Sequence, residues 1–241
     1  MQYLGGKSKI RKQIAAFLES VRKPGQIYFE PFVGGAWVLQ EMSGERVASD
    51  GNPALIAMYR ALQKGWVPPE FVSEEEYRRY KSMPMSDDPT QAFVMIGCSF
   101  GGKWGGGYGR GKMSAAASRR TVLKQLPLIK EAFFECRPFQ VWSPNDLLIY
   151  ADPPYQGTTT YGAFDGFDHS LFWVTMSRWA KDNTVVVSEY VAPIDWRCVR
   201  EFRSHTEMRG SAGRIPRVER LFMHESRVEL GVDSPHADSV H

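Results

Sequence analysis

Short strand-like runs followed by helical patterns constrain the fold of this chain more than any other feature. After an amphipathic helical pattern over residues 7–20, the run IYFEPF (27–32) leads through two glycines into AWVLQEM (36–42), which has helical spacing. The run RVASD (46–50) then leads into NPALIAMYRALQ (52–63), a helical pattern that begins with a capping residue and a proline. Two consecutive strand–helix units predict an α/β sheet whose strands run mostly parallel.

The strand and helix alternation stops near residue 64 and returns near residue 133. The intervening segment shows helical patterns and a loop with seven glycines between residues 101 and 111. The later part contains the strand-like runs LLIYA (147–151) and TVVVSEY (184–190), and then two alternating runs that predict an antiparallel hairpin. We therefore expect an α/β sheet domain interrupted by a helical insertion. The predicted bounds are 1–63 and 132–225 for the sheet domain, 64–131 for the insertion and 226–241 for a flexible C-terminal tail.

Charge is unevenly distributed along the chain. The formal net charge is +3, yet residues 97–130 contain seven Lys or Arg residues and no Asp or Glu, so the remainder carries a formal charge of −4. This balance excludes a histone-like polycation and indicates a mildly acidic body with one strongly basic segment.

Cysteine spacing and hydropathy exclude several other classes. Cys98, Cys136 and Cys198 are widely spaced and form neither a disulfide framework nor a CxxC zinc motif, so no metal site is expected. The N-terminus lacks the apolar core of a signal peptide, and no stretch approaches 18 uninterrupted apolar residues. We expect a cytoplasmic protein that does not enter a membrane.

The strongest chemical motif is Asp152-Pro153-Pro154-Tyr155, directly after the predicted strand LLIYA. Consecutive prolines stiffen the chain and leave backbone carbonyls without a helical or sheet partner. A carboxylate, such a carbonyl and an aromatic ring then lie together at the carboxyl end of a strand, where open α/β sheets bind ligands. An exocyclic amine on a planar base needs that set, because it requires two acceptors for its N–H groups and a ring to stack on.

A second motif, Glu30-Pro31-Phe32-Val33-Gly34-Gly35, follows the first predicted strand. Its glycines allow the backbone to approach a ligand closely, and Asp50, at the end of the next strand, can accept hydrogen bonds from both hydroxyls of a ribose. Together they indicate an adenosine-type cofactor. The GxGxxG fingerprint is not met, and Gly5-Gly6-Lys7-Ser8 lacks the first glycine and the preceding strand of a P-loop, which excludes an NTPase.

Five motifs in order resemble the DNA adenine-N6 methyltransferases of the Dam (D12) class, with the α-type motif order of bacterial and phage enzymes, over about residues 2–224. The motifs are Tyr3-Leu4-Gly5-Gly6-Lys7, Glu30-Pro31-Phe32-Val33-Gly34-Gly35, Ser49-Asp50-Gly51-Asn52-Pro53, Asp152-Pro153-Pro154-Tyr155 and Ser188-Glu189-Tyr190. The resemblance implies a Rossmann-like methyltransferase fold, S-adenosylmethionine as cofactor, and a target-recognition insertion between the ribose-binding acid and the DPPY motif. The basic helical segment occupies that place here.

The resemblance also implies roles for individual residues. The cofactor site would comprise Tyr3, Lys7, Pro31, Phe32, Gly34, Gly35, Asp50 and Asp152. The catalytic residues would be Asp152, Pro153, Pro154 and Tyr155. Asp152 and the Pro153 carbonyl would bind the N6 amine of a flipped adenine, and Tyr155 would stack on its ring.

One stretch departs from the family pattern. Members commonly carry Gly-Asp-Phe or Gly-Asp-Tyr before the DPPY motif, and the acid binds the adenine amine of the cofactor. Arg137-Pro138-Phe139 takes that place in this chain, and Asp146 is a candidate substitute acceptor.

The basic segment is the expected DNA-binding element. We expect DNA contacts from Lys103, Trp104, Tyr108, Arg110, Lys112, Arg119 and Arg120. Arg110 would read a guanine edge and the two adjacent arginines would contact phosphates, whereas Trp104 or Tyr108 would wedge into the duplex or simply pack beneath the glycine-rich loop. The loop 156–168 would close over the flipped base, and the loop 209–217 would touch the DNA backbone or remain solvated.

The expected activity is therefore adenine-N6 methylation of double-stranded DNA by a monomer or weak dimer with no obligate protein partner. Cytosine-N4 methylation uses the same geometry but more often has Ser-Pro-Pro-Tyr, and a catalytically silent DNA-binding protein on this fold is the alternative from a different class. The recognition sequence, GATC or another, stays open, as does the setting in a phage, a restriction–modification system or a housekeeping pathway.

Overall fold

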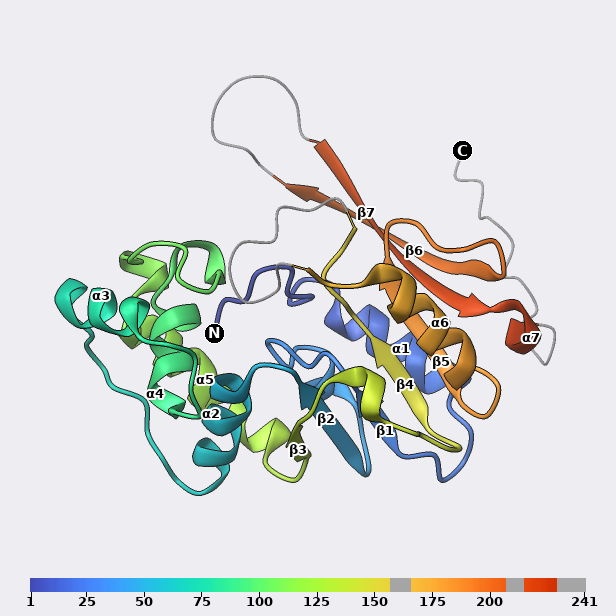
Figure 1. The fold of residues 1–241 in the computed structure, drawn as a ribbon, viewed down its shortest axis with the longest axis horizontal. Coiled ribbons are helices and arrows are strands. Elements are labelled where there is room, and N and C mark those ends of the chain that lie inside the picture. Colours follow the sequence, from blue (N-terminus) through green and yellow to red (C-terminus); the bar gives the residue numbers. More distant parts are fainter. Residues whose placement is uncertain (157–165, 207–214, 229–241) are drawn as a thin grey trace.

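The protein is a mixed α/β structure built on one seven-stranded sheet (Figure 1). The computed structural model describes residues 1–156, 166–206 and 215–228, without the side chains of residues 112, 204–206, 215–217 and 228. The strand order is β3-β2-β1-β4-β5-β7-β6. The strands are β1 (Tyr28–Glu30), β2 (Arg46–Asp50), β3 (Phe133–Cys136), β4 (Leu148–Ala151), β5 (Thr184–Glu189), β6 (Trp196–Thr206) and β7 (Ile215–His224).

Parallel pairing joins the first five strands of this order, from β3 to β5. β7 runs antiparallel to both of its neighbours, β5 and β6, so the C-terminal hairpin completes the sheet. The sequence-based prediction of a mostly parallel sheet with a C-terminal hairpin is confirmed. The order 3-2-1-4-5 reverses direction between β1 and β4, which is the point at which doubly wound sheets bind ligands.

Helices cover both faces of the sheet. They are α1 (Arg11–Val21), α2 (Pro53–Gln63), α3 (Glu74–Ser82), α4 (Pro89–Ala92), α5 (Ala115–Ile129), α6 (His169–Trp179) and α7 (Glu225–Val228). A π-helical turn, Phe93–Gly97, extends α4, and short 3-10 turns occur at Leu39–Glu41, Phe100–Gly102, Gly111–Met113 and Phe139–Val141.

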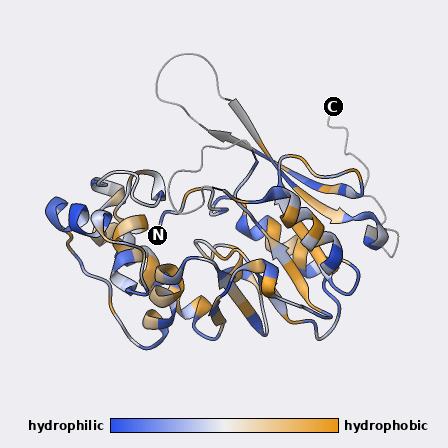
Figure 2. Ribbon diagram, in the orientation of Figure 1, coloured by the Kyte–Doolittle hydropathy of each residue, from blue (hydrophilic) through white to orange (hydrophobic). Residues whose placement is uncertain are grey.

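Strand β4 shows how the two faces are separated. All four of its side chains are buried, as is typical of a strand inside a parallel sheet. Leu148 and Tyr150 pack into a cluster with α1, α2, α4 and α5, whereas Ile149 and Ala151 pack into a second cluster with α6. The central strands, such as β4 and β5, are correspondingly apolar in Figure 2, whereas the C-terminal hairpin includes hydrophilic stretches.

The predicted insertion, 64–131, contains α3, α4 and α5, which form a helical lobe beside β2 and β3 (Figure 1). Its buried side chains, such as Phe93 and Val122, belong to the same hydrophobic cluster as Tyr28 and Tyr150 of the sheet. Within the described residues, the lobe and the sheet therefore share one core.

The segment between β1 and β2 was expected to be a helix over 36–42, and this prediction is wrong. Only one 3-10 turn forms there, over Leu39–Glu41. Ala36 has a φ of 53° and Gly34 a φ of 43°, so the chain turns through the left-handed region before it can begin a helix. Apolar residues at helical spacing, Val38, Leu39 and Met42, are buried there in an irregular loop.

The other helices agree more closely with their predicted positions. α2 has the predicted cap, because the Asn52 side chain accepts from the Leu55 N–H and Pro53 occupies the first turn. α1 begins at Arg11 rather than Lys7, because residues 7–10 form a turn in which the Ile10 N–H donates to the Lys7 carbonyl.

The C-terminal tail was expected to begin at residue 226, and this boundary is corrected. Residues 226–228 belong to α7, and Arg227 donates to the carbonyls of Ala180 and Lys181 after α6. Residues 229–241 lie outside the described part of the chain. No helix among the described residues is both long and apolar enough to cross a membrane.

Candidate functional site

The carboxyl ends of β1, β2 and β4 open into one cavity of about 690 Å³. Glu30 ends β1, Asp50 ends β2 and Asp152 follows β4, so the parallel pairing brings three carboxyl groups to one edge of the sheet. This volume lies within the range of small-molecule and cofactor sites. All the residues predicted for cofactor and catalysis line it: Tyr3, Lys7, Pro31, Phe32, Gly34, Gly35, Asp50, Asp152, Pro153, Pro154 and Tyr155.

Asp152 forms an ion pair with the N-terminal loop. Lys7 Nζ donates to both of its carboxylate oxygens, at 2.7 and 2.8 Å. The Lys7 side chain is 6% exposed and that of Asp152 is 21% exposed, so the pair lies at the wall of the cavity with one face accessible. Lys7 therefore engages both oxygens of the Asp152 carboxylate at the cavity wall.

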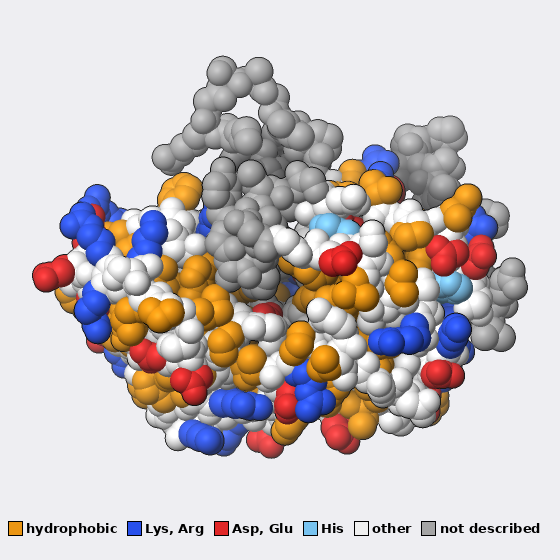
Figure 3. Space-filling model, viewed as in Figure 1, with side chains coloured by type: hydrophobic (Ala, Val, Ile, Leu, Met, Phe, Trp, Pro, Cys, Tyr) orange, Lys and Arg blue, Asp and Glu red, His pale blue; other side chains and the backbone are white. Residues whose placement is uncertain are grey.

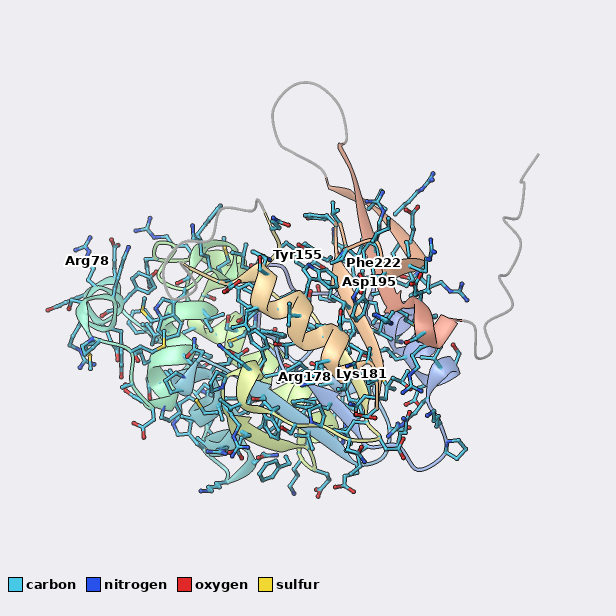
Figure 4. All side chains as sticks on the ribbon, turned by 45° about the vertical axis from the view of Figure 1, so that its right-hand side comes forward. Arg78, Tyr155, Arg178, Lys181, Asp195 and Phe222 are labelled. Carbon is cyan, nitrogen blue, oxygen red and sulfur yellow. The ribbon has the colours of Figure 1, made fainter. Side chains whose placement is uncertain are left out.

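Tyr155 lies beside this pair with its ring fixed on several sides. The Lys7 ammonium is 4.7 Å from the ring centre, the Tyr190 ring packs against it edge-on at 4.7 Å, and the hydroxyl donates to Glu219 of β7. In Figure 4, Tyr155 lies near one end of α6, and Arg178 and Lys181 mark the other. The motif therefore presents an acceptor and an aromatic ring within one small volume.

Asp50 is a buried carboxylate that organises the glycine loop. Its oxygens accept from the backbone N–H groups of Gly34, at 3.1 Å, and Asn52, at 3.0 Å. Burial raises its pKa from 3.8 to about 6, and these backbone N–H donors partly oppose the rise. Each oxygen keeps acceptor capacity for a ligand hydroxyl.

The glycine loop itself is tightly packed. A Cβ atom on Gly34 would lie 2.8 Å from the Tyr3 ring, so this close approach requires glycine. Tyr59 of α2 donates to the Gly34 carbonyl at 2.7 Å. Gln125 of α5 donates to the carbonyls of Gly35 and Ala36, at 3.0 and 2.9 Å. Side chains from α2 and α5 thus satisfy the backbone carbonyls of a loop that was expected to lead into a helix.

Glu30 lines the cavity and two more glutamates lie behind its wall, and sequence reasoning gave none of the three a role. Burial raises the pKa of Glu30 from 4.5 to about 8, while its carboxylate accepts from the Tyr28 hydroxyl at 2.5 Å. Burial likewise raises the pKa of Glu189 from 4.5 to about 7, and its two oxygens accept from the N–H groups of Gln156 and Tyr190. The third is Glu219, 3.6 Å from Lys7 Nζ. The positions of Glu30 and Glu189 at strand ends could have indicated them, whereas no sequence signal marked Glu219.

The stretch that departs from the family pattern lines the same cavity. Pro138, Phe139 and Gln140 contribute to its wall, and the Phe139 ring packs against Phe32 at 5.2 Å. Asp146 cannot substitute for the missing acid, because it precedes β4 at the opposite end of the strand from Asp152 and accepts from Gln26. Gln140 is the polar side chain that this stretch offers to a ligand.

The predicted DNA-binding residues lie in three different places: at the cavity wall, packed on the core and on the outer surface. Lys103 and Trp104 line the cavity. Tyr108 is packed on the core, with its hydroxyl donating to the Val72 carbonyl at 2.7 Å. On the outer surface, Arg110 pairs with Glu74, Arg119 pairs with Glu70 and Arg120 is exposed.

Figure 3 shows Lys and Arg side chains gathered on the outer face of the helical lobe. Arg120 and Lys124 line a shallow groove on α5, together with Ala117 and Thr121. The side chain of Lys112, residues 157–165 of one predicted loop and residues 209–214 of the other lie outside the described part of the chain. All three cysteines are free, and no group of His, Cys, Asp or Glu among the described residues is arranged to hold a metal ion.

The fold and cavity define a mixed α/β protein with a cavity at the carboxyl edge of a mostly parallel sheet. Residues 3–94, fewer than half of the chain, match the family model of the D12 class N6 adenine-specific DNA methyltransferases. The matched segment includes Lys7, the glycine loop and Asp50 and ends before β3.

Comparison with solved structures gives similar proteins at low sequence identity. One is described as a "putative methyltransferase" from Escherichia coli, with 12% identity, a TM-score of 0.39 and coverage of 92% of this chain and 88% of the other. Another is described as a "putative methylase" from Haemophilus influenzae, with 9% identity, a TM-score of 0.34 and coverage of 92% and 91%. No curated protein sequence matches the chain.

Proposed function

We propose that the protein transfers a methyl group from S-adenosylmethionine to N6 of an adenine flipped out of duplex DNA. The observation that carries this proposal is the single cavity that contains both Asp50 with the glycine loop and Asp152 with Tyr155. A methyl donor and a planar amine can meet there. The family match over residues 3–94 supports the same reaction.

The residues around Asp50 fit an adenosine-type cofactor. The Asp50 carboxylate would accept from the ribose hydroxyls, with Tyr3, Lys7, Pro31, Phe32, Gly34 and Gly35 lining the rest of the site. Gln140 offers a donor and an acceptor to the adenine ring, where the family pattern has an acid. When bound, the cofactor supplies an electrophilic methyl group on a positively charged sulfur.

The DPPY motif would activate the target amine. The lone pair of an adenine amine is delocalised into the ring, so the amine is a poor nucleophile. Asp152 and the Pro153 carbonyl would accept hydrogen bonds from its two N–H groups, which favours tetrahedral geometry at nitrogen and stabilises the positive charge that develops there as the bond between methyl and sulfur breaks. The transfer would leave S-adenosylhomocysteine, and N6 would lose one proton. Pro154 stiffens the motif, and alignment of the amine with the methyl group would supply much of the remaining rate.

Base capture must offset the cost of flipping, which is a few kcal/mol. Stacking on Tyr155 would return about 1–3 kcal/mol of it. The 64–131 segment would act as the recognition unit, with Lys103, Trp104, Arg110, Lys112, Arg119 and Arg120 as its DNA contacts and with Tyr108 packed beneath the glycine-rich loop. Arg110 is 79% exposed in its pair with Glu74, and such a surface pair contributes at most about 1 kcal/mol, so DNA can replace it easily.

Methyl transfer from labelled S-adenosylmethionine to duplex DNA tests the proposal. Hydrolysis of the product to nucleosides should yield labelled N6-methyl-2′-deoxyadenosine, and Asp152→Asn should reduce the label by at least about tenfold because an amide accepts through one oxygen only. Asp182→Asn is the matched control, since Asp182 is exposed beyond the C-terminal end of α6.

The outcomes separate the alternatives. Recovery of labelled N4-methyl-2′-deoxycytidine would show that cytosine, and not adenine, is the target base. DNA binding without transfer of label would identify a catalytically silent DNA-binding protein, and equal label with Asp152→Asn and the control would refute the catalytic assignment.

A further inference from the structure

Lys7 occupies the volume in which the proposed function places the target amine. Its Nζ donates to both oxygens of Asp152, at 2.7 and 2.8 Å, and lies 4.7 Å from the centre of the Tyr155 ring. These are the two side chains assigned to the flipped base, one as acceptor and the other as stacking surface. Because an ammonium group and an amine cannot share this volume, Lys7 must move when the base enters.

A buried ammonium group needs a charged partner in its new position. Only 6% of the Lys7 side chain is exposed, and separating a buried charge from its partner is strongly unfavourable when nothing replaces that partner. Nζ has two further oxygen neighbours among the described residues, the Gly5 carbonyl at 3.1 Å and Glu219 Oε1 at 3.6 Å. Of these two, only Glu219 carries a charge.

Glu219 also contacts the stacking ring. It lies on β7, its side chain is 9% exposed, and it accepts a hydrogen bond from the Tyr155 hydroxyl. A single carboxylate therefore contacts both the ammonium group that must move and the ring that must stay in place.

Two other glutamates lie near Asp152, and each accepts hydrogen bonds from donors of its own, as Glu219 does from Tyr155. Glu30 accepts from the Tyr28 hydroxyl, and Glu189 uses both oxygens on backbone N–H groups of Gln156 and Tyr190. Neither forms an ion pair with Lys7 Nζ, whereas Glu219 Oε1 lies 3.6 Å from it.

We propose that Glu219 is a positioning residue for methyl transfer: it receives Lys7 from Asp152 as the target amine arrives, and it keeps Tyr155 in the stacking orientation. This inference rests on the proposed function and deepens it. Lys7 then acts as an internal occupant of the amine position, which keeps Asp152 paired until a base replaces it.

Glu219→Gln tests the charge without removing the acceptor for Tyr155. Steady-state kinetics on duplex DNA should be measured at saturating S-adenosylmethionine, with Glu201→Gln as the matched control. Glu201 lies in the same hairpin, on β6, and forms an exposed pair with Arg220 at 2.8 Å. We expect kcat/KM for DNA to fall by about tenfold or more in Glu219→Gln and by less than about twofold in the control, with KM for the cofactor within about twofold in both.

A second background isolates the contribution of Lys7. In Lys7→Met, no ammonium group has to move, so adding Glu219→Gln should change kcat/KM for DNA by less than about twofold. This comparison does not require the single Glu219→Gln variant to fold, because it is made between Lys7→Met and the double variant. Melting temperatures of all variants check that folding is retained.

The results distinguish failure of the inference from failure of the proposed function. Wild-type protein that transfers no methyl group refutes the proposed function and the inference with it. Active wild-type protein with Glu219→Gln indistinguishable from Glu201→Gln refutes the inference alone. A tenfold loss that persists in the Lys7→Met background, or a Lys7→Met protein without activity at saturating cofactor, also overturns it.

Discussion

Glu30 is expected to make the protein less stable as the pH rises, and Glu30→Gln should remove this penalty. The side chain is 3% exposed at the end of β1, and burial, reinforced by nearby Asp152, raises its pKa from 4.5 to about 8. The folded state therefore binds this proton more tightly than the unfolded state. Its contribution is fully present below about pH 4.5 and is lost as the pH rises towards 8.

The magnitude follows from this pKa. A rise from 4.5 to about 8 limits the penalty to about 5 kcal/mol at high pH, of which about 3 kcal/mol develops between about pH 5.5 and 8.5. Glutamine does not ionise, and its carbonyl oxygen can still accept from the Tyr28 hydroxyl. Between these two pH values, the free energy of unfolding of the wild type should therefore fall by about 3 kcal/mol more than that of Glu30→Gln.

Urea unfolding followed by tryptophan fluorescence, at about pH 5.5 and 8.5, measures the difference. Burial also raises the pKa values of Asp50 and Glu189, so both proteins lose stability with pH, and only the difference between them reports Glu30. Glu45→Gln, at an exposed position before β2, is the matched control. Equal pH dependence in Glu30→Gln and wild type would refute the reasoning.

Three further predictions concern the loop, the cofactor and DNA. Gly34→Ala should lower the free energy of unfolding by about 2–4 kcal/mol in denaturant titrations, because it combines a positive φ with a Cβ 2.8 Å from the Tyr3 ring; a change below about 1 kcal/mol would contradict this packing. Asp50→Asn should weaken S-adenosylmethionine binding by about tenfold in calorimetry, since an amide accepts through one oxygen, and unchanged affinity would count against the ribose role. Arg119→Ala should weaken binding to every DNA sequence and reduce its salt dependence, whereas Arg110→Ala should relax preference at one base pair; equal losses on all sequences would refute this division.

The sheet and the main cavity were predictable from sequence because local patterns define them. Strand β2 has the bounds that its run indicated, and α2 begins at the predicted cap. Parallel strands bring their carboxyl ends to one edge of the sheet. The motifs around Asp50 and Asp152 therefore lie together as a consequence of the parallel strand pairing.

Contacts between distant segments were not predictable in this way. The helical spacing of residues 36–42 correctly indicated which side chains are buried, but it did not predict the backbone conformation. Gly34 and Ala36 have positive φ angles, so the chain turns there before a helix can begin. Glu219 looked like one charge among many in an alternating hairpin. Only the insertion of β7 between β5 and β6 brings it to Lys7, and no local pattern encodes that pairing.

The hydrogen bonds from Gln125 to the glycine loop have a consequence for the design of chimeric proteins. Its amide, buried on α5, donates to the carbonyls of Gly35 and Ala36, so the helical lobe supplies part of the support of the proposed cofactor site. The lobe therefore cannot be exchanged independently of the sheet. A chimera that exchanges residues 64–131 to alter the proposed sequence preference would have to carry over a glutamine at this position, or it would disturb the proposed cofactor site as well.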